Sequence, residues 1–131
     1  MDSSTAFSFG RRLAGTPAEL RPAVEAALKT EGFGILTEID VAATMKAKLG
    51  VERAPYLILG ACNPPLAHRA LEAEPSVGTL LPCNVILRAD GDATIVEAMD
   101  PGAVMALVDS AELTAVAEDV RARLIRALDS L

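Results

Sequence analysis

Apolar and polar positions alternate along the chain with two periods, one typical of strands and one typical of helices. Three strand-forming runs open three successive blocks, at residues 5–13, 33–39 and 55–62. The run at 55–62 is almost continuously apolar, which predicts a central strand covered on both faces. A helical pattern follows each run, so the first half of the chain is predicted to alternate strands with helices.

Each predicted helix begins after a side chain that can cap it, and the three caps are Thr16, Asp40 and Asn63. Thr16 and Glu19 form a capping box ahead of the first helix, and Pro64 suits the first position of the third. The second helix carries Val41, Met45 and Leu49 at a spacing of four and ends at Gly50. The third helix is predicted to bury a stripe formed by Leu66, Ala67, Ala70 and Leu71.

Residues 82–99 form the strongest hairpin signal in the sequence. Asp90-Gly91 lies between two runs of strand-forming residues, as a type I′ turn requires. A two-residue loop there predicts a register in which Asn84 lies opposite Glu97 and Cys83 lies opposite Ala98. A short helix should begin after Asp100, and a last amphipathic helix should span about residues 110–130.

This order of elements predicts an α/β protein of the α+β type, folded as one domain over residues 1–131. The expected architecture is a two-layer sandwich in which helices cover a mixed sheet of about five strands. The C-terminal helix is expected to cover the sheet, to pack on a partner subunit, or to do both.

Composition narrows the possible partners. Hydrophobic residues make up 51% of the chain but aromatic residues only 3%, so few rings can stack on nucleobases or flat cofactors. Haem and flavin are therefore less favoured, and the sequence leaves the identity of any cofactor open. The net charge of −6 argues against a nucleic-acid partner. The N-terminus does not resemble a signal peptide, and no apolar run is long enough to span a membrane. The protein is therefore expected to be cytoplasmic, with reduced cysteines.

Cys62 is the best candidate for chemistry. It precedes the cap Asn63, so its sulfur could lie near unpaired backbone N–H groups at the positive end of a helix dipole. Such a position would lower the pKa of the thiol and produce the thiolate that a nucleophile or a soft-metal ligand needs. The alternative is that Cys62 is a small hydrophobic residue at the end of a strand.

Cys83 is the only other cysteine, and on a period of two it shares a face with Val85 and Leu87, which indicates the core. Whether the two sulfurs can meet depends on whether their strands run parallel or antiparallel. Two thiols alone suit two-coordinate Cu(I) or a redox pair better than zinc, which prefers four ligands.

The remaining polar candidates are weaker. Glu38 could be a general base or a cation ligand, or it could simply face solvent beside the cap Asp40. His68, the only histidine, lies off the apolar stripe of its helix and is expected to be exposed. The common nucleotide-binding and hydrolase motifs are absent.

Four segments together resemble the domain-of-unknown-function 302 family: GFGILTEIDV, MKAKLG, PYLILGACNPPLAHRALEAEP and VGTLLPCNVILR. The closest likeness is to a branch with Cys-Asn-Pro and a later Pro-Cys-Asn, where other branches have Gly-Asn-Pro and lack the second cysteine. The resemblance covers about residues 5–108 and leaves the helix from residue 110 outside. It implies a compact α/β domain that is often dimeric and has no established activity.

The resulting hypothesis is a small cytoplasmic homodimer that binds a small ligand or a soft metal ion at a cysteine-containing site. In this site Cys62 is an activated thiolate and Cys83 a second ligand, while Asn63 and Asn84 donate hydrogen bonds and Glu38 lies nearby. One alternative is a thiol enzyme or sulfur carrier in which Cys83 resolves an intermediate formed on Cys62. The other is a structural interaction module whose cysteines only pack.

Overall fold

The computed structural model describes all residues, 1–131. Its backbone forms one six-stranded sheet, in the order β1-β2-β6-β5-β4-β3, together with five α-helices and one 3₁₀ helix. In chain order the elements are β1 (Ser3–Ser4), β2 (Ser8–Ala14), α1 (Pro17–Thr30), β3 (Gly34–Asp40), α2 (Val41–Leu49), β4 (Tyr56–Cys62), α3 (Pro64–Ala73), η1 (Pro75–Leu80), β5 (Cys83–Asp90), β6 (Ala93–Met99), α4 (Pro101–Met105) and α5 (Ala111–Asp129).

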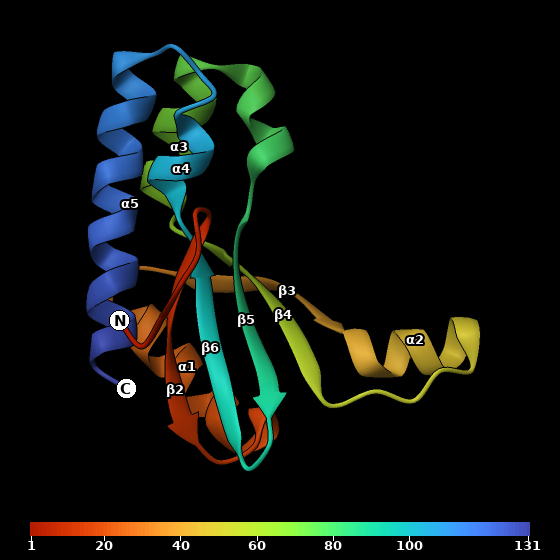
Figure 1. The fold of residues 1–131 in the computed structure, drawn as a ribbon. Helices are drawn as coiled ribbons and strands as arrows, with labels where there is room; N and C mark the ends of the chain where they lie inside the picture. The colour runs from red at the N-terminus through yellow and green to blue at the C-terminus, as the bar shows by residue number, and fades with distance from the viewer.

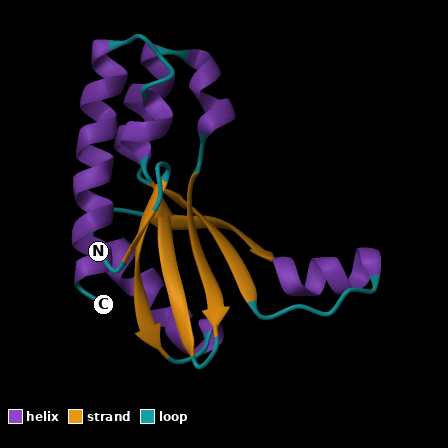
Figure 2. Ribbon diagram, in the orientation of Figure 1, coloured by secondary structure: helices purple, strands orange, loops and turns teal.

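Helices and sheet form two layers, as predicted for an α+β protein (Figure 1). Helices α1 and α5 pack on one face of the sheet, while α3, α4 and η1 stack beyond one end of the strands (Figure 2). Alternation along the strands decides which side chains meet the helices. On β5 these are Val85 and Leu87, both fully buried, and they belong to the same apolar core as Leu28 of α1 and Leu124 of α5.

The sheet differs from the prediction in its topology. Six strands are present instead of about five, and every pairing is antiparallel, whereas a mixed sheet was predicted. The physical reason lies in the connections. A parallel pair requires a helix that returns across the sheet face, but α2 extends away from the sheet edge and α3 stacks at its end (Figure 1). Strand β4 therefore runs back beside β3, and β5 runs back beside β4.

The hairpin between β5 and β6 forms, but its register was predicted wrongly. Asp90 pairs with Ala93, and Val85 rather than Cys83 lies opposite Ala98. The loop consists of Gly91 and the residue after it, because only the glycine adopts a positive φ, of 63°. A type I′ turn at Asp90-Gly91 would have required a positive φ at Asp90 as well, which costs more for a residue with a Cβ.

The apolar stripes of α2 and α3 are only partly covered by the rest of the fold. Helix α2 begins after its predicted cap Asp40 and ends at Gly50, yet it has no buried residue. In α3, Leu66 and Ala70 are buried as expected, but Leu71 is 41% exposed. None of the helices combines the length and the apolar character that crossing a lipid bilayer would require.

Candidate functional site

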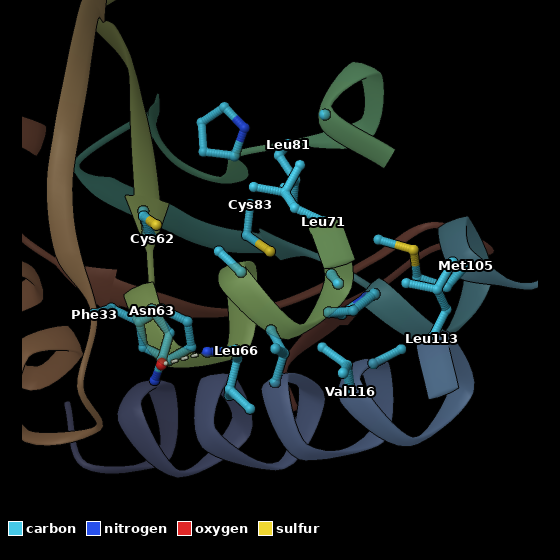
Figure 3. Close-up of a pocket in the computed structure, with 18 of the residues that line it drawn as sticks. Phe33, Cys62, Asn63, Leu66, Leu71, Leu81, Cys83, Met105, Leu113 and Val116 are labelled. Atoms are coloured by element: carbon cyan, nitrogen blue, oxygen red, sulfur yellow. Dashed lines mark hydrogen bonds between the residues drawn. The ribbon is translucent and has the colours of Figure 1, made fainter. Parts of the chain in front are cut away.

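A cavity of about 330 Å³ lies at the end of the sheet where β4 ends and β5 begins. Figure 3 shows its walls, to which α3, α4 and α5 contribute Leu66, Met105 and Val116. Fifteen of the nineteen lining residues are hydrophobic, and none carries a charged side chain. The volume falls at the lower end of the range typical of small-molecule sites.

Asn63 holds the junction between β4 and α3 beside this cavity. Its side-chain oxygen accepts a hydrogen bond from the backbone N–H of Leu66 at 3.4 Å, which confirms the predicted cap. Its amide nitrogen donates to the carbonyl of Glu31 at 3.3 Å, at the end of α1. Gly32 lies against this amide, where a Cβ would approach the Asn63 nitrogen to 2.8 Å. Asn63 is 8% exposed, and both ends of its amide bind within the chain.

The two cysteines line the same cavity (Figure 3). Ala61 pairs with Cys83 in the antiparallel ladder between β4 and β5, which brings the end of one strand beside the start of the other. Cys62 is partly buried, and Cys83 is 7% exposed. Burial raises the pKa of Cys62, and burial together with the neighbouring Cys62 raises the pKa of Cys83 to about 11. Both thiols are therefore protonated at neutral pH.

The predicted activation of Cys62 is contradicted, because its pKa moves up where the sequence argument expected it to move down. The reason is visible at the start of α3. Pro64 and Pro65 occupy the first two helical positions and have no backbone N–H. The next N–H, of Leu66, is already bound by Asn63. The helix therefore presents no free donors in its first three positions to stabilise a thiolate.

The structure places two other predicted site residues elsewhere. Asn84 follows Cys83 on β5, so it points to the opposite face of the sheet, where it is exposed and pairs with Gly60. Glu38 lies on the edge strand β3 and forms an ion pair with Arg21 of α1. Neither residue lines the cavity. His68 is exposed on α3, as expected.

No group of three or more His, Cys, Asp or Glu side chains is arranged to hold a metal ion. Within the cavity, the side chains that could ligate a soft metal are the thiols of Cys62 and Cys83 and the thioether of Met105.

The larger part of the cavity wall was not identified from the sequence. Met105 of α4 and Leu113 and Val116 of α5 line the cavity beside Leu71 (Figure 3). The sequence had placed these residues in two C-terminal helices without indicating a cavity. The one signal in the sequence was the apolar stripe of α3, whose members Leu66 and Leu71 line the cavity.

Comparison with known proteins gives a family and a fold but no activity. The family model for a domain of unknown function, DUF302, matches residues 9–131. This match includes α5, which the resemblance in the sequence had left outside. A solved structure, of an uncharacterized conserved DUF302 protein from Bacillus stearothermophilus, is 28% identical and superimposes with a TM-score of 0.88. The likeness covers 95% of this chain and 98% of the other. Among curated proteins, none matches.

Proposed function

The chain belongs to the DUF302 family of domains of unknown function, and we propose that it binds a small, uncharged and largely apolar molecule in the cavity beside Cys62 and Cys83. The observation that carries this proposal is the chemistry of the wall, which is apolar and free of charged side chains. An ionised ligand would lose its hydration there without gaining a partner. An apolar chain loses no such hydration, and a neutral polar end loses far less than a charged one.

The size of the cavity sets the size of the ligand. One water molecule occupies roughly 30 Å³ in the liquid, so the cavity accommodates about ten non-hydrogen atoms. The protonated thiols of Cys62 and Cys83 add two weak donors to an otherwise apolar wall. A short alkyl chain with a neutral polar end fits both constraints.

A matched pair of probes tests this proposal directly. We expect 1-octanol to bind and to shift the amide NMR signals of residues along the cavity, such as Leu66 and Met105. Octanoate has the same chain but carries a carboxylate, and it should bind at least tenfold more weakly because its charge finds no partner. Equal affinity for both probes would contradict the proposal.

Two variants on one helix provide the structural control. Ala67 lines the cavity, so Ala67→Phe should fill part of it and weaken 1-octanol binding at least tenfold. Ala73 lies on the same helix, is exposed and does not line the cavity. Ala73→Phe should therefore bind 1-octanol like the unmodified protein, with far-UV circular dichroism confirming that both variants are folded. Unchanged binding in Ala67→Phe would place the ligand elsewhere.

A soft metal ion held by the two thiols is the second candidate function. It is favoured by one observation, that Cys62 lies close enough to Cys83 to contribute to the rise in its pKa. Competition between the reduced protein and bicinchoninate for Cu(I) tests it. One Cu(I) per chain is expected, with binding lost in both Cys62→Ser and Cys83→Ser. Retention of Cu(I) by the double variant would exclude this site.

A thiol enzyme or a sulfur carrier is less favoured, because burial raises the pKa of both thiols and lowers their thiolate fraction at neutral pH. If neither 1-octanol nor Cu(I) binds, the cysteines are packing residues of a structural module.

A further inference from the structure

The cavity at the end of the sheet has a deep end and a mouth. Its walls from α4 and α5 are closed, since Met105 is 6% exposed and Leu113 only 1%. Two leucines that line the same cavity are far more exposed, Leu71 at 41% and Leu36 at 67% (Leu71 in Figure 3). A lining residue with so much exposed surface lies at the opening, so these two leucines mark the mouth.

Leu36 reaches the mouth because the ladder between β3 and β4 is irregular at its position. Its neighbours Ile35 and Thr37 pair with consecutive residues of β4, so Leu36 has no partner in the ladder. An extra residue of this kind is a β-bulge, which bends its strand and changes the direction of a side chain. Bulges are over-represented at sheet edges and next to active sites, and β3 is an edge strand.

Gly60 of β4 ties this bulge to the wall of the cavity. A Cβ at Gly60 would lie 2.2 Å from Oγ1 of Thr37 and 2.8 Å from Cγ of Pro82. Thr37 and Pro82 therefore both pack where any other residue at position 60 would have its side chain. Since Pro82 lines the cavity, the pairing that leaves Leu36 outside the ladder is fixed next to the cavity itself.

We propose that Leu36 closes the mouth of the cavity and packs on the end of the ligand that lies there, so that it sets the length of chain the site retains. This inference rests on the proposed function and adds to it a residue that determines specificity. It gives a reason for two unfavourable features of the free protein, an interrupted ladder and a leucine that exposes most of its surface. An apolar chain that covers Leu36 offsets both.

The size of the cavity indicates which chains reach Leu36. 1-Hexanol is shorter than the roughly ten non-hydrogen atoms that the cavity accommodates, whereas 1-decanol is longer. The shorter alcohol can lie wholly in the deep end, while the longer one must extend to the mouth and contact Leu36. Each methylene that is buried there should raise the affinity about fourfold.

The two alcohols, compared in matched leucine variants, test the inference. Leu36→Ala should weaken 1-decanol binding at least about fivefold, because the end of the chain loses its apolar contact. It should leave 1-hexanol binding unchanged. Leu49→Ala is the control, since Leu49 is 69% exposed but does not line the cavity, and it should bind both alcohols like the unmodified protein. General loosening of the fold would weaken both alcohols alike, so the difference between them is specific to the mouth.

Access to Cys62 tests the mouth without any ligand. Cys62 lines the cavity and is only partly buried, so iodoacetamide should reach it past Leu36. In the Cys83→Ala background, Leu36→Ala should raise the alkylation rate at least about twofold and Leu36→Trp should lower it, with the apparent pKa of the reaction unchanged. Leu49→Ala should leave the rate as it is.

Equal 1-decanol affinities in Leu36→Ala and Leu49→Ala, or equal alkylation rates in the two, would overturn the inference. If 1-octanol binds and only these comparisons fail, the proposed function stands without a closing residue. If no alcohol binds but the Leu36 variants still control alkylation, the proposed ligand class is wrong, while Leu36 remains the residue that closes the mouth.

Discussion

Alkaline pH should destabilise the fold through Cys83, and removing that thiol by Cys83→Ala should remove the effect. In the folded protein Cys83 is 7% exposed, and burial together with the neighbouring Cys62 raises its pKa to about 11 from the usual 9.0. Below pH 9 the thiol is protonated in the folded and the unfolded chain alike, and it adds no pH dependence. Above pH 9 the unfolded chain releases the proton while the folded chain retains it.

The free energy of unfolding should therefore fall as the pH rises from about 9 to about 11. One pKa unit corresponds to 1.36 kcal/mol, so a shift of about two units gives a total loss of about 3 kcal/mol. Part of the loss appears early: at pH 10 the expected loss from this thiol is about 1.4 kcal/mol. This is a large part of the stability of a small domain.

Urea unfolding of the unmodified protein and of Cys83→Ala, at neutral pH and at pH 10 to 11, measures the effect. All other ionisable side chains are the same in both proteins, so their contributions cancel in the difference between the two. The cost of truncating the side chain is the same at each pH and cancels as well. Protein concentration must be held constant, since association would add to the apparent stability.

Cys62→Ala is the control, because Cys62 is less buried and its removal should leave most of the alkaline loss in place. If the free energies of the unmodified protein and of Cys83→Ala fall in parallel with pH, the reasoning is refuted. In that case the buried thiol does not control the alkaline limit of stability.

Three further predictions concern single positions. Alkylation of Cys62 by iodoacetamide, followed against pH in the Cys83→Ala background, should give an apparent pKa above that of an ordinary cysteine thiol, because burial raises it. An apparent pKa well below the ordinary value would restore the activated thiolate. Asn63→Ala should lower the free energy of unfolding in urea by about 1–3 kcal/mol, because the helix cap and the hydrogen bond to Glu31 are both lost. Asn63→Asp keeps the oxygen that caps the helix and should lower it less. Equal losses in the two variants would contradict the role of the oxygen. Gly10→Ala should lower the free energy of unfolding by about 1–3 kcal/mol, because its Cβ would lie 2.2 Å from the carbonyl oxygen of Val96. Gly34→Ala should be close to neutral, since a Cβ there meets nothing within 4 Å. Similar melting temperatures for the two variants would contradict the close approach at Gly10.

The local elements could be predicted because their signals are local. Thr16, Asp40 and Asn63 each cap the helix that follows, as expected, because a side-chain oxygen reaches a backbone N–H only three residues away. The hairpin was found for the same reason, but its turn was misplaced by one residue. The pattern of apolar residues marks the two strands, whereas the choice between Asp90 and Gly91 depends on which residue tolerates a positive φ.

The chemistry of the candidate site was predicted only in part. The sequence singled out Cys62, Asn63 and Cys83, and the structure brings all three to one cavity. It also suggested a thiolate near free N–H groups, although two adjacent prolines already excluded donors at the first two helical positions. That error could have been avoided from the sequence itself. The positions of Asn84 and Glu38 could not be predicted from the sequence. They depend on how the strands pair and on an ion pair between β3 and α1.

Short-range periodicity and capping chemistry thus determined most of the helices and strands of this protein, and the resemblance of four sequence segments indicated its family. Only the tertiary structure decided that the sheet is wholly antiparallel, because the path of a connection depends on where its helix packs and not on its own sequence. The same packing left α2 uncovered and enclosed an apolar cavity around two protonated thiols. Burial is a property of what surrounds a residue, and those surroundings come from distant parts of the chain.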